Sequence, residues 1–180
     1  MTDDLFNETP VERPTHPAGQ DEAELLKSCT IRKGRTSGPG GQHRNKVETH
    51  VHITHGPTGL VGQAGERRSA EVNRKVAIRR LRLALATEHR VGVPAGEIRS
   101  ALWRSRVRGG RIACNPGHAD YPAMLAEAMD LLWACGHDPK PAAVRLGCSP
   151  SQLLKRVQAH PPALDALNRA REARGERALR

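Results

Sequence analysis

The stretch SGPGGQHRNKVETHVHITHGPTGL, residues 37–60, places a glycine-rich segment directly before a strand-like alternation. Positions 38–41 hold three glycines and one proline, and Gln42 follows at once. In THVHITH, residues 49–55, apolar residues alternate with polar ones, which is the pattern of a half-buried strand. GPTG, residues 56–59, has the composition of a turn. The stretch therefore predicts a pliable loop, a strand and the turn of a hairpin.

Working outward from this hairpin, the sequence predicts an α+β fold. DEAELLKS, residues 21–28, has the pattern of a short helix, and SCTIRKGR, residues 28–35, that of a strand. A returning strand begins at LVGQ, residues 60–63. Residues 69–90 predict a long helix with an apolar stripe and a basic flank. We therefore expect a small sheet packed by one helix.

The C-terminal part predicts an all-α region that resembles a helix-turn-helix. A helix is expected from Tyr121 to about Gly136, and a shorter one ends at Gly147. Ser149 followed three residues later by Gln152 is the pattern of a capping box at the start of the next helix. The same spacing also fits a three-helix packing module without any ligand, and both interpretations stay open.

These patterns predict four segments along the 180 residues. We expect a disordered acidic tail over residues 1–20, a catalytic domain over 21–90, a basic connector over 91–118 and a helical region with a basic end over 119–180.

Charge is concentrated around the glycine-rich stretch. The formal net charge of the chain is +10, and residues 31–90 alone carry thirteen basic and four acidic residues. Such an excess is typical of proteins that bind nucleic acid. Only four residues are Phe, Trp or Tyr, which is too few for a base-stacking platform. We therefore expect RNA to be bound through its phosphates and its shape.

The other function classes receive little support from the sequence. The four cysteines are far apart, so neither a disulfide framework nor a zinc knuckle is expected, and a reducing cytoplasm fits them. No apolar run reaches the length of a membrane span. His50, His52 and His55 are interpreted as outward-facing surface residues rather than metal ligands. We expect no metal, no cofactor and no membrane, and a monomer.

The stretch resembles the GGQ domain of bacterial and organellar peptide chain release factors. The resemblance runs from about Cys29 to about Arg90 and includes several motifs in register. They are Gly40-Gly41-Gln42, Asn45-Lys46, the Thr-His…Pro-Thr-Gly of the hairpin, and Arg68, Ser69 and Asn73. A P-loop would need Gly-Lys-Ser/Thr, and a dinucleotide-binding loop would need GxGxxG within a βαβ unit; neither pattern fits.

The resemblance implies an enzyme that hydrolyses the ester of peptidyl-tRNA within the ribosome. Gly40, Gly41 and Gln42 would enter the peptidyl transferase centre of the 23S rRNA and act on the P-site peptidyl-tRNA. Gln42 would orient water without ionising, and a backbone N–H beside it would stabilise the oxyanion. Glycine permits a positive φ and close approach to RNA.

RNA contacts are expected from basic and polar residues in both parts of the chain, and the C-terminal arginines could contact the mRNA channel of the ribosome. The expected residues are Arg35, His43, Arg44, Asn45, Lys46, Arg67, Arg68, Arg74, Lys155, Arg156, Arg169, Arg171 and Arg174.

Three features favour a codon-independent ribosome-rescue factor of the ArfB type over a factor that reads stop codons. Neither a Pro-x-Thr nor a Ser-Pro-Phe codon-reading tripeptide occurs in the sequence, and only 39 residues precede Gly40. Val47 also stands where the rescue branch often has valine. Two alternatives remain: release from a damaged or specialised stalled complex, and a non-catalytic RNA-binding or regulatory protein that uses the helix-turn-helix-like region.

Overall fold

The fold was analysed in a computed structural model that describes residues 14–35, 48–94 and 96–180. Its N-terminal part consists of a short 3₁₀ helix, a helix, three strands and a long helix, namely η1 (Pro17–Gly19), α1 (Glu22–Lys27), β1 (Cys29–Gly34), β2 (His50–His55), β3 (Val61–Ala64) and α3 (Ala70–Glu88). Its C-terminal part consists of α4 (Ala101–Arg106), β4 (Val107–Arg108), β5 (Arg111–Ile112), α5 (Tyr121–Ala134), α6 (Pro139–Leu146), α7 (Pro150–Gln158) and α8 (Pro161–Glu172). The α+β class is confirmed.

The three strands form an antiparallel sheet in the order β1-β2-β3. Gly34 pairs with His50 at one end of the β1–β2 ladder, and Cys29 pairs with His55 at the other. Along β2, Val51, Ile53 and His55 are buried, and the residues between them are partly exposed. The alternation in the sequence therefore gave the correct buried face for β2.

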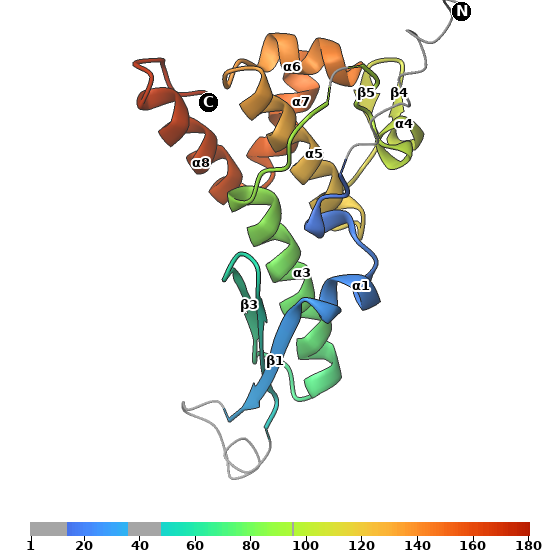
Figure 1. The fold of residues 1–180 in the computed structure, drawn as a ribbon, viewed down its shortest axis with the longest axis vertical. Helices are drawn as coiled ribbons and strands as arrows, with labels where there is room; N and C mark the ends of the chain where they lie inside the picture. Colours follow the sequence, from blue (N-terminus) through green and yellow to red (C-terminus); the bar gives the residue numbers. More distant parts are fainter. Residues whose placement is uncertain (1–13, 36–47, 95) are drawn as a thin grey trace, which may run out of the picture.

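Helix α3 covers the buried face of β2 and β3 (Figure 1). Ala77, Leu81 and Leu85 on this helix are fully buried, as expected for its apolar stripe. The contact with β3 is unusually close at Gly62. A Cβ placed there would lie 2.1 Å from the Ala77 carbonyl oxygen and 2.5 Å from the Leu81 nitrogen. Only glycine allows this strand to approach the helix backbone so closely.

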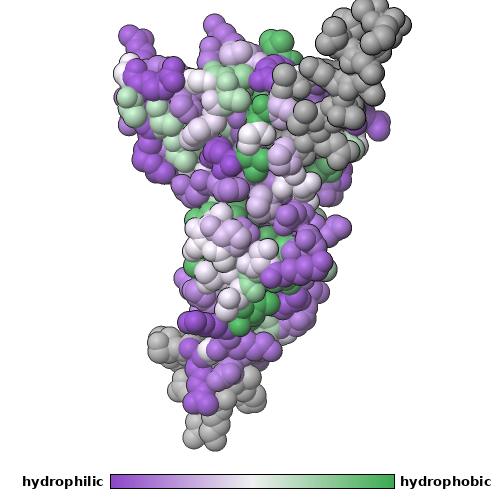
Figure 2. All heavy atoms as spheres, in the orientation of Figure 1, coloured by the Kyte–Doolittle hydropathy of each residue, from purple (hydrophilic) through white to green (hydrophobic). Residues whose placement is uncertain are grey.

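The second half of α3 packs against α5 and α8, so this helix belongs to both parts of the molecule. At 19 residues it is about 28 Å long. Figure 1 shows the sheet at one end of an elongated molecule and the helices α5–α8 at the other. In the view of Figure 2, hydrophilic residues dominate both ends, and hydrophobic residues show in small separate areas.

The C-terminal helices share a core with α4. Trp103 is fully buried, and its indole nitrogen donates to the Leu146 carbonyl over 2.8 Å. Tyr121 is buried as well, and its hydroxyl donates to the Arg156 carbonyl over 2.8 Å. Burial raises the pKa of Tyr121 to about 12, so this hydroxyl keeps its proton and its hydrogen bond.

Three local features differ from the sequence-based expectations. Residues 14–20, expected within a disordered tail, are part of the fold: Ala18 in η1 is fully buried, and its carbonyl accepts from Arg82 over 3.1 Å. Part of the expected connector, residues 91–118, forms α4 and the β4–β5 hairpin. Ser149 caps α7 as expected, but the side chain of Gln152 accepts from Ile112 instead of completing a capping box.

Among the described residues, none of the helices combines the length and the apolar character that a membrane crossing would require.

Candidate functional site

The two strands that bracket the glycine-rich stretch end side by side. Gly34 is the last residue of β1 and pairs with His50, the first residue of β2. This pair lies at the end of the sheet that points away from the C-terminal helices (Figure 1). Any connection between β1 and β2 must therefore start and finish at this end.

The residues expected to carry the chemistry lie outside the described residues. They are Gly40, Gly41 and Gln42, together with His43, Arg44, Asn45 and Lys46. Their roles stay predictions, and the described residues that flank them form the rest of the site.

Asn73 fixes the end of this connection that leads into β2. The side chain of Asn73 is fully buried in the first turns of α3. Its Nδ2 donates to the Thr49 carbonyl over 2.6 Å and to the Arg67 carbonyl over 2.8 Å. Its Oδ1 accepts from the Arg67 backbone N–H over 2.9 Å. One amide thus ties the residue before β2 to the turn before α3.

The same turn presents basic side chains beside the strand ends. Arg67 and Arg68 are exposed, and Ser69 caps α3 by accepting from the Val72 N–H over 3.4 Å. Glu66 forms an ion pair with Arg80 over 2.6 Å, which ties the turn to the side of α3. Since Asn73 joins this turn to Thr49, the two arginines are held next to the start of β2. This placement supports the RNA-contact role expected for them.

The two other expected RNA contacts near the sheet, Arg35 and Arg74, differ in whether an acidic residue pairs with them. Arg35 is exposed directly after β1, as a phosphate contact would require. Arg74 instead forms ion pairs with Glu22 over 3.1 Å and with Glu71 over 4.0 Å. Its charge is therefore partly balanced within the protein, and Arg74 is the weaker candidate.

The Thr-His…Pro-Thr-Gly motif builds the β2–β3 turn at the opposite end of the sheet. His55 Nδ1 lies 2.8 Å from Thr58 Oγ1, and the Gly59 N–H donates to the His55 carbonyl over 2.8 Å. Gly59 has a φ of 70°, which favours glycine. This motif is explained by the architecture of the hairpin.

The expectation that all three histidines face outward is wrong for His55. His50 and His52 are partly exposed, whereas His55 is 3% exposed on the face covered by α3. Burial, assisted by His89, lowers the pKa of His55 below its usual value. Within residues 14–35, 48–94 and 96–180, no three His, Cys, Asp or Glu residues gather to hold a metal.

In the helix-turn-helix-like region, α6 and α7 flank a turn in which Gly147 is left-handed, with a φ of 67°. Lys155 on α7 is exposed, and its RNA contact stays a prediction. Arg156 is only 7% exposed, and its guanidinium donates to the carbonyls of Cys114 and Ile112. The structure contradicts the RNA contact expected for Arg156, because the side chain is buried and both of its terminal amino groups donate inside the protein.

The C-terminal arginines also differ from one another. Arg169 is exposed and lies 3.9 Å from Glu88, and Arg174 is exposed beside Glu176. The side chain of Arg171 is only 14% exposed, since it pairs with Glu176 and donates to the carbonyls of His137 and Arg177. Arg171 holds the chain end in place, which contradicts its expected role as a free RNA contact.

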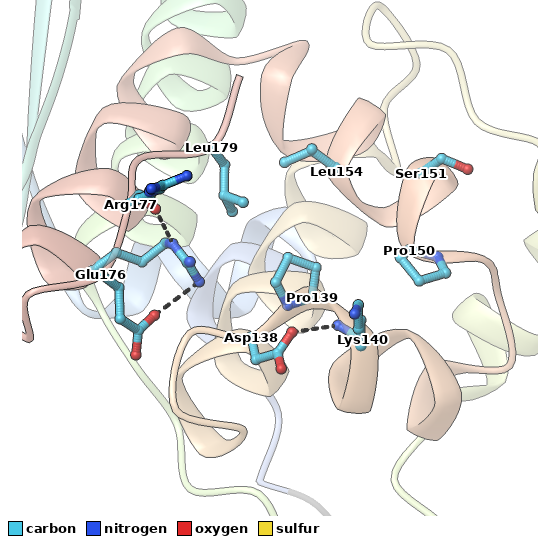
Figure 3. A pocket seen from close by; sticks show the side chains of 10 residues that line it. Asp138, Pro139, Lys140, Pro150, Ser151, Leu154, Glu176, Arg177 and Leu179 are labelled. Atoms are coloured by element: carbon cyan, nitrogen blue, oxygen red, sulfur yellow. Dashed lines mark hydrogen bonds and ion pairs between the residues drawn. The ribbon is translucent and has the colours of Figure 1, made fainter.

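This chain end closes one side of an open pocket of about 680 Å³ between α6 and α7 (Figure 3). Leu179 points into the pocket opposite Leu154, and its backbone is held by two hydrogen bonds to the side chain of Asn168. The C-terminal segment is therefore packed onto α8.

Sequence reasoning missed the close approach at Gly62 and the anchoring role of Asn73. A glycine inside a strand pattern is a signal of close backbone contact, and Gly62 carries that signal. Asn73 was noted only as part of a motif, and nothing local in the sequence identifies Thr49 as its partner.

Comparison with known proteins places this site in a family. Residues 24–110 match the model of the RF-1 domain. The chain is 46% identical over 76 residues to peptide chain release factor 1 of Acidiphilium cryptum, covering 42% of the chain and 21% of that protein. It is 33% identical over 109 residues to peptide chain release factor 2 of Staphylococcus saprophyticus, covering 57% of the chain and 27% of that protein.

A third relative, peptide chain release factor 1 of Xylella fastidiosa, is 46% identical over 56 residues, which is 31% of the chain and 16% of that protein. The chain thus spans about a quarter or less of the length of these relatives. The shared segment contains the paired strand ends, Asn73 and the capped start of α3. Residues 24–110 thus belong to the RF-1 domain family, and over part of its length the chain is similar to peptide chain release factors 1 and 2.

Proposed function

We propose that this protein promotes ribosome-dependent hydrolysis of the ester bond in peptidyl-tRNA and so releases the nascent peptide. The observation that carries the proposal is the match to the RF-1 domain over residues 24–110, with Gly40-Gly41-Gln42 in the connection between two strands that end as neighbours. The partners are the 23S rRNA at the peptidyl transferase centre and the P-site peptidyl-tRNA.

The chemistry assigned to the tripeptide follows from the needs of ester hydrolysis. Attack of water on the ester carbonyl creates an oxyanion, and a backbone N–H beside Gln42 would stabilise it. The neutral amide of Gln42 would hold the water against the ester. An amide has no pKa that suits a general base, so the proton must leave through the ribosome and the tRNA. We therefore expect little hydrolysis of peptidyl-tRNA by the protein alone.

The basic residues around the strand ends support binding of this end of the sheet to rRNA. Arg35 follows β1, and Arg67 and Arg68 are held beside the start of β2 through Asn73. Charges at the end of the sheet that carries the glycine-rich connection would offset the field of the surrounding phosphates.

The specific form of the activity that we propose is codon-independent rescue of stalled ribosomes. Val47, which stands where the rescue branch often has valine, supports it. Release from a damaged or specialised stalled complex is the closest alternative within the same chemistry.

The decisive test compares release of labelled peptide from two ribosome complexes, one stalled on a message that ends in the P site and one with a stop codon in the A site. If the protein is a rescue factor, it should release the peptide from the stalled complex, which has no stop codon in the A site. Gln42→Ala should lower release by roughly 100-fold or more, with ribosome binding retained. Release by the variant near the wild-type rate would refute the role of Gln42. Equal inactivity of both proteins on both complexes would favour the non-catalytic RNA-binding alternative.

A further inference from the structure

We propose that the β4–β5 hairpin is a second RNA-binding surface, which contacts the phosphate backbone of folded RNA through Arg108 and Arg111. The two residues flank the turn of the hairpin and pair with each other across it. Both are exposed, and neither forms an ion pair with any residue that the structure describes. This surface, here called the arginine hairpin, comprises residues 107–112.

The shape of the turn keeps its tip open to a ligand. Gly109 and Gly110 have φ values of 54° and 74°, the left-handed pair required by a two-residue hairpin turn. A Cβ on either glycine would meet nothing within 4 Å. The tip therefore offers two guanidinium groups on either side of a bare backbone, and a polyanion can approach it without a steric barrier.

The arrangement of charge is unfavourable for the protein alone. Like charges placed directly opposite each other across two strands are destabilising. Here the two opposed arginines occupy a hairpin with only two residue pairs, so packing within the strands contributes little to offset the repulsion. A bound phosphate backbone would remove this repulsion by pairing with both cations.

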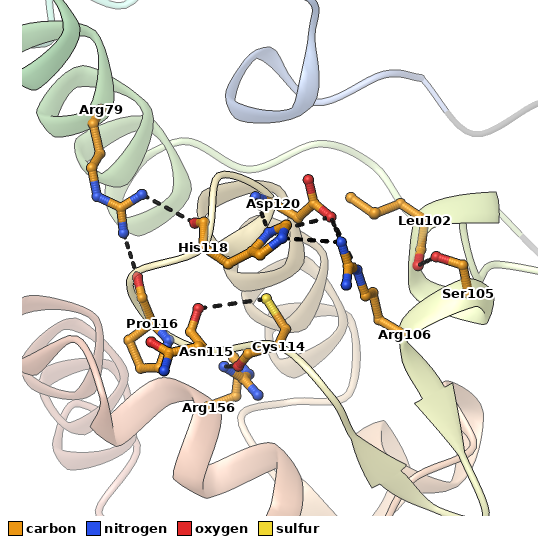
Figure 4. Close-up of polar contacts among 10 residues, drawn as sticks. All are labelled: Arg79, Leu102, Ser105, Arg106, Cys114, Asn115, Pro116, His118, Asp120 and Arg156. Atoms are coloured by element: carbon orange, nitrogen blue, oxygen red, sulfur yellow. Dashed lines mark hydrogen bonds and ion pairs between the residues drawn. The ribbon is translucent and has the colours of Figure 1, made fainter.

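The hairpin is nevertheless held rigidly, as a recognition element requires. The Gly110 carbonyl accepts from the Ser149 N–H over 3.3 Å, and the Ile112 N–H donates to Gln152 Oε1 over 3.3 Å. Buried Arg156, drawn beside Cys114 in Figure 4, donates to the Cys114 carbonyl. It also donates to the Ile112 carbonyl. These contacts use backbone atoms and leave the side chains of Arg108 and Arg111 free.

The anchoring contacts also bring other cations nearby. The anchors are Ser149, which caps α7, and Gln152 and Arg156 on α7 itself. Exposed Lys155 lies three residues after Gln152, one helical turn along. Arg104 on α4 is exposed just before the hairpin. Arg106 is different, because Asp120 neutralises it over 2.5 Å (Figure 4). The arginine hairpin thus carries two exposed cations, Arg108 and Arg111, and two more, Arg104 and Lys155, belong to the elements beside it.

Phosphate contact is favoured over reading of bases. The two aromatic residues nearest in sequence, Trp103 and Tyr121, are at most 1% exposed and cannot stack on a base. Arginines without aromatic neighbours position a protein on a nucleic acid backbone and carry little sequence information.

The choice of RNA as the polyanion rests on the proposed function. The arginine hairpin lies among the C-terminal helices, and the strand ends that bracket the glycine-rich stretch lie at the other end of the molecule (Figure 1). If the strand ends face the peptidyl transferase centre, the hairpin reaches a separate RNA segment. Two contacts on a rigid body would fix the orientation of the protein as well as its affinity.

The test measures binding of the full chain to a fluorescent RNA stem-loop by anisotropy at several salt concentrations. R108Q/R111Q should bind about tenfold more weakly near 0.1 M salt, and its salt slope should be shallower by roughly 1.5 to 2. R108K/R111K keeps the charges and should stay within about threefold of wild type. The single variants R108Q and R111Q each remove one cation that is unpaired among the described residues. Their control is K27Q, which removes one cation that is already paired with Glu24 over 2.7 Å. Thermal unfolding checks that all variants are folded.

Peptide release supplies a second readout that separates this inference from the proposed function. R108Q/R111Q should raise the factor concentration needed for half-maximal release and leave the maximal rate unchanged, since the hairpin is remote from the strand ends. Absence of release by the wild-type protein would refute the proposed function and leave the stem-loop result standing. An RNA affinity and salt slope of R108Q/R111Q equal to those of wild type would overturn the hairpin inference, whatever the release assay shows.

Discussion

The side-chain amide of Asn73 donates to the backbone carbonyl of Thr49 over 2.6 Å, across 24 positions of sequence. Thr49 directly precedes β2, and Asn73 lies in the first turns of α3. The same amide group exchanges two further hydrogen bonds with the backbone of Arg67. The RF-1 domain thus uses one buried side chain to hold the outgoing end of the glycine-rich connection against a basic turn.

Replacement of Asn73 by aspartate should separate the strand end from the helix. Asn73→Asp keeps an oxygen for the Arg67 N–H and removes the donor to the Thr49 and Arg67 carbonyls. It also places a carboxylate against two carbonyl oxygens in a buried site. We expect a loss of about 3 kcal/mol or more in the free energy of unfolding, measured by urea denaturation.

Ser69→Ala is the matched control for this variant. It removes the cap of the same helix and should cost about 1 kcal/mol, while the Thr49 carbonyl keeps its partner. At a temperature where both variants are folded, peptide release should fall further in Asn73→Asp than in Ser69→Ala. Equal release by the two variants would show that the contact to Thr49 serves stability alone.

A methyl group at Gly62 should force β3 away from α3. The added Cβ of Gly62→Ala would fall 2.1 Å from a backbone oxygen, which no rotation of a side chain can relieve. We expect destabilisation of about 3 kcal/mol or more in urea. Gly34→Ala is the control in the same sheet, because a Cβ there meets nothing within 4 Å. Its stability should stay within about 0.5 kcal/mol of wild type. Similar effects of the two substitutions would contradict the close packing of β3 on α3.

The elements with local signals could be predicted from the sequence. The alternation in residues 50–55 gave the buried face of β2, and Gly147 and Ser149 gave the turn and the cap between α6 and α7. Each of these patterns depends on residues within a few positions of one another, and backbone geometry translates them directly into structure.

The predictions that the structure contradicts concern residues whose partners lie far along the chain. Arg156 looks like any exposed arginine on a short helix, yet its partners are carbonyls 42 and 44 positions away. Arg171 is held by a carbonyl 34 positions away. Whether a cation faces solvent or a buried carbonyl is decided by tertiary packing, which charge counts along the sequence do not contain. His55 is a different case, because the alternation that buries Val51 and Ile53 also places His55 on the buried face, and the expectation of an outward-facing His55 disregarded it.

Acid should weaken the fold through histidines that are buried or partly buried. Burial is the first cause that lowers the pKa of His55, His137 and His160. A histidine with a lowered pKa in the folded state stays neutral while the unfolded chain takes up a proton. The free energy of unfolding should therefore be highest above about pH 6.5 and fall as the pH drops below that value.

His137→Asn isolates one of these groups. Besides burial, the pKa of His137 is lowered by the nearby cations Arg174, Arg171 and Arg90 and raised by Glu176. Asparagine tolerates the φ of 67° found at this position and does not titrate in this range. Urea denaturation at about pH 7.5 and about pH 5.5 should show a smaller difference for the variant than for wild type. An unchanged difference would assign the acid sensitivity to the other histidines.

Two arginines near the C-terminus should respond differently to the same substitution. Arg171 is largely buried and donates to the His137 carbonyl over 2.7 Å and to the Arg177 carbonyl over 2.9 Å. Arg171→Gln should lower the free energy of unfolding by about 1–3 kcal/mol, because those carbonyls and Glu176 lose their partner. The side chain of Arg174 is 56% exposed, and Arg174→Gln should change stability by less than about 0.5 kcal/mol.

Binding to ribosomes should be affected more by Arg174→Gln than by Arg171→Gln, the reverse of their order in stability. If the chain end contacts RNA, Arg174→Gln should make the salt slope of binding shallower by slightly less than about 1, the value expected for one phosphate contact. Arg171→Gln should leave the slope unchanged wherever the variant is folded, because its guanidinium is used within the protein. A shallower slope in Arg171→Gln would mean that the C-terminal segment leaves α8 on binding and exposes this arginine. An unchanged slope in Arg174→Gln would exclude this arginine from the RNA contact and leave Arg169, Lys155 and the arginine hairpin as the candidates in the C-terminal part.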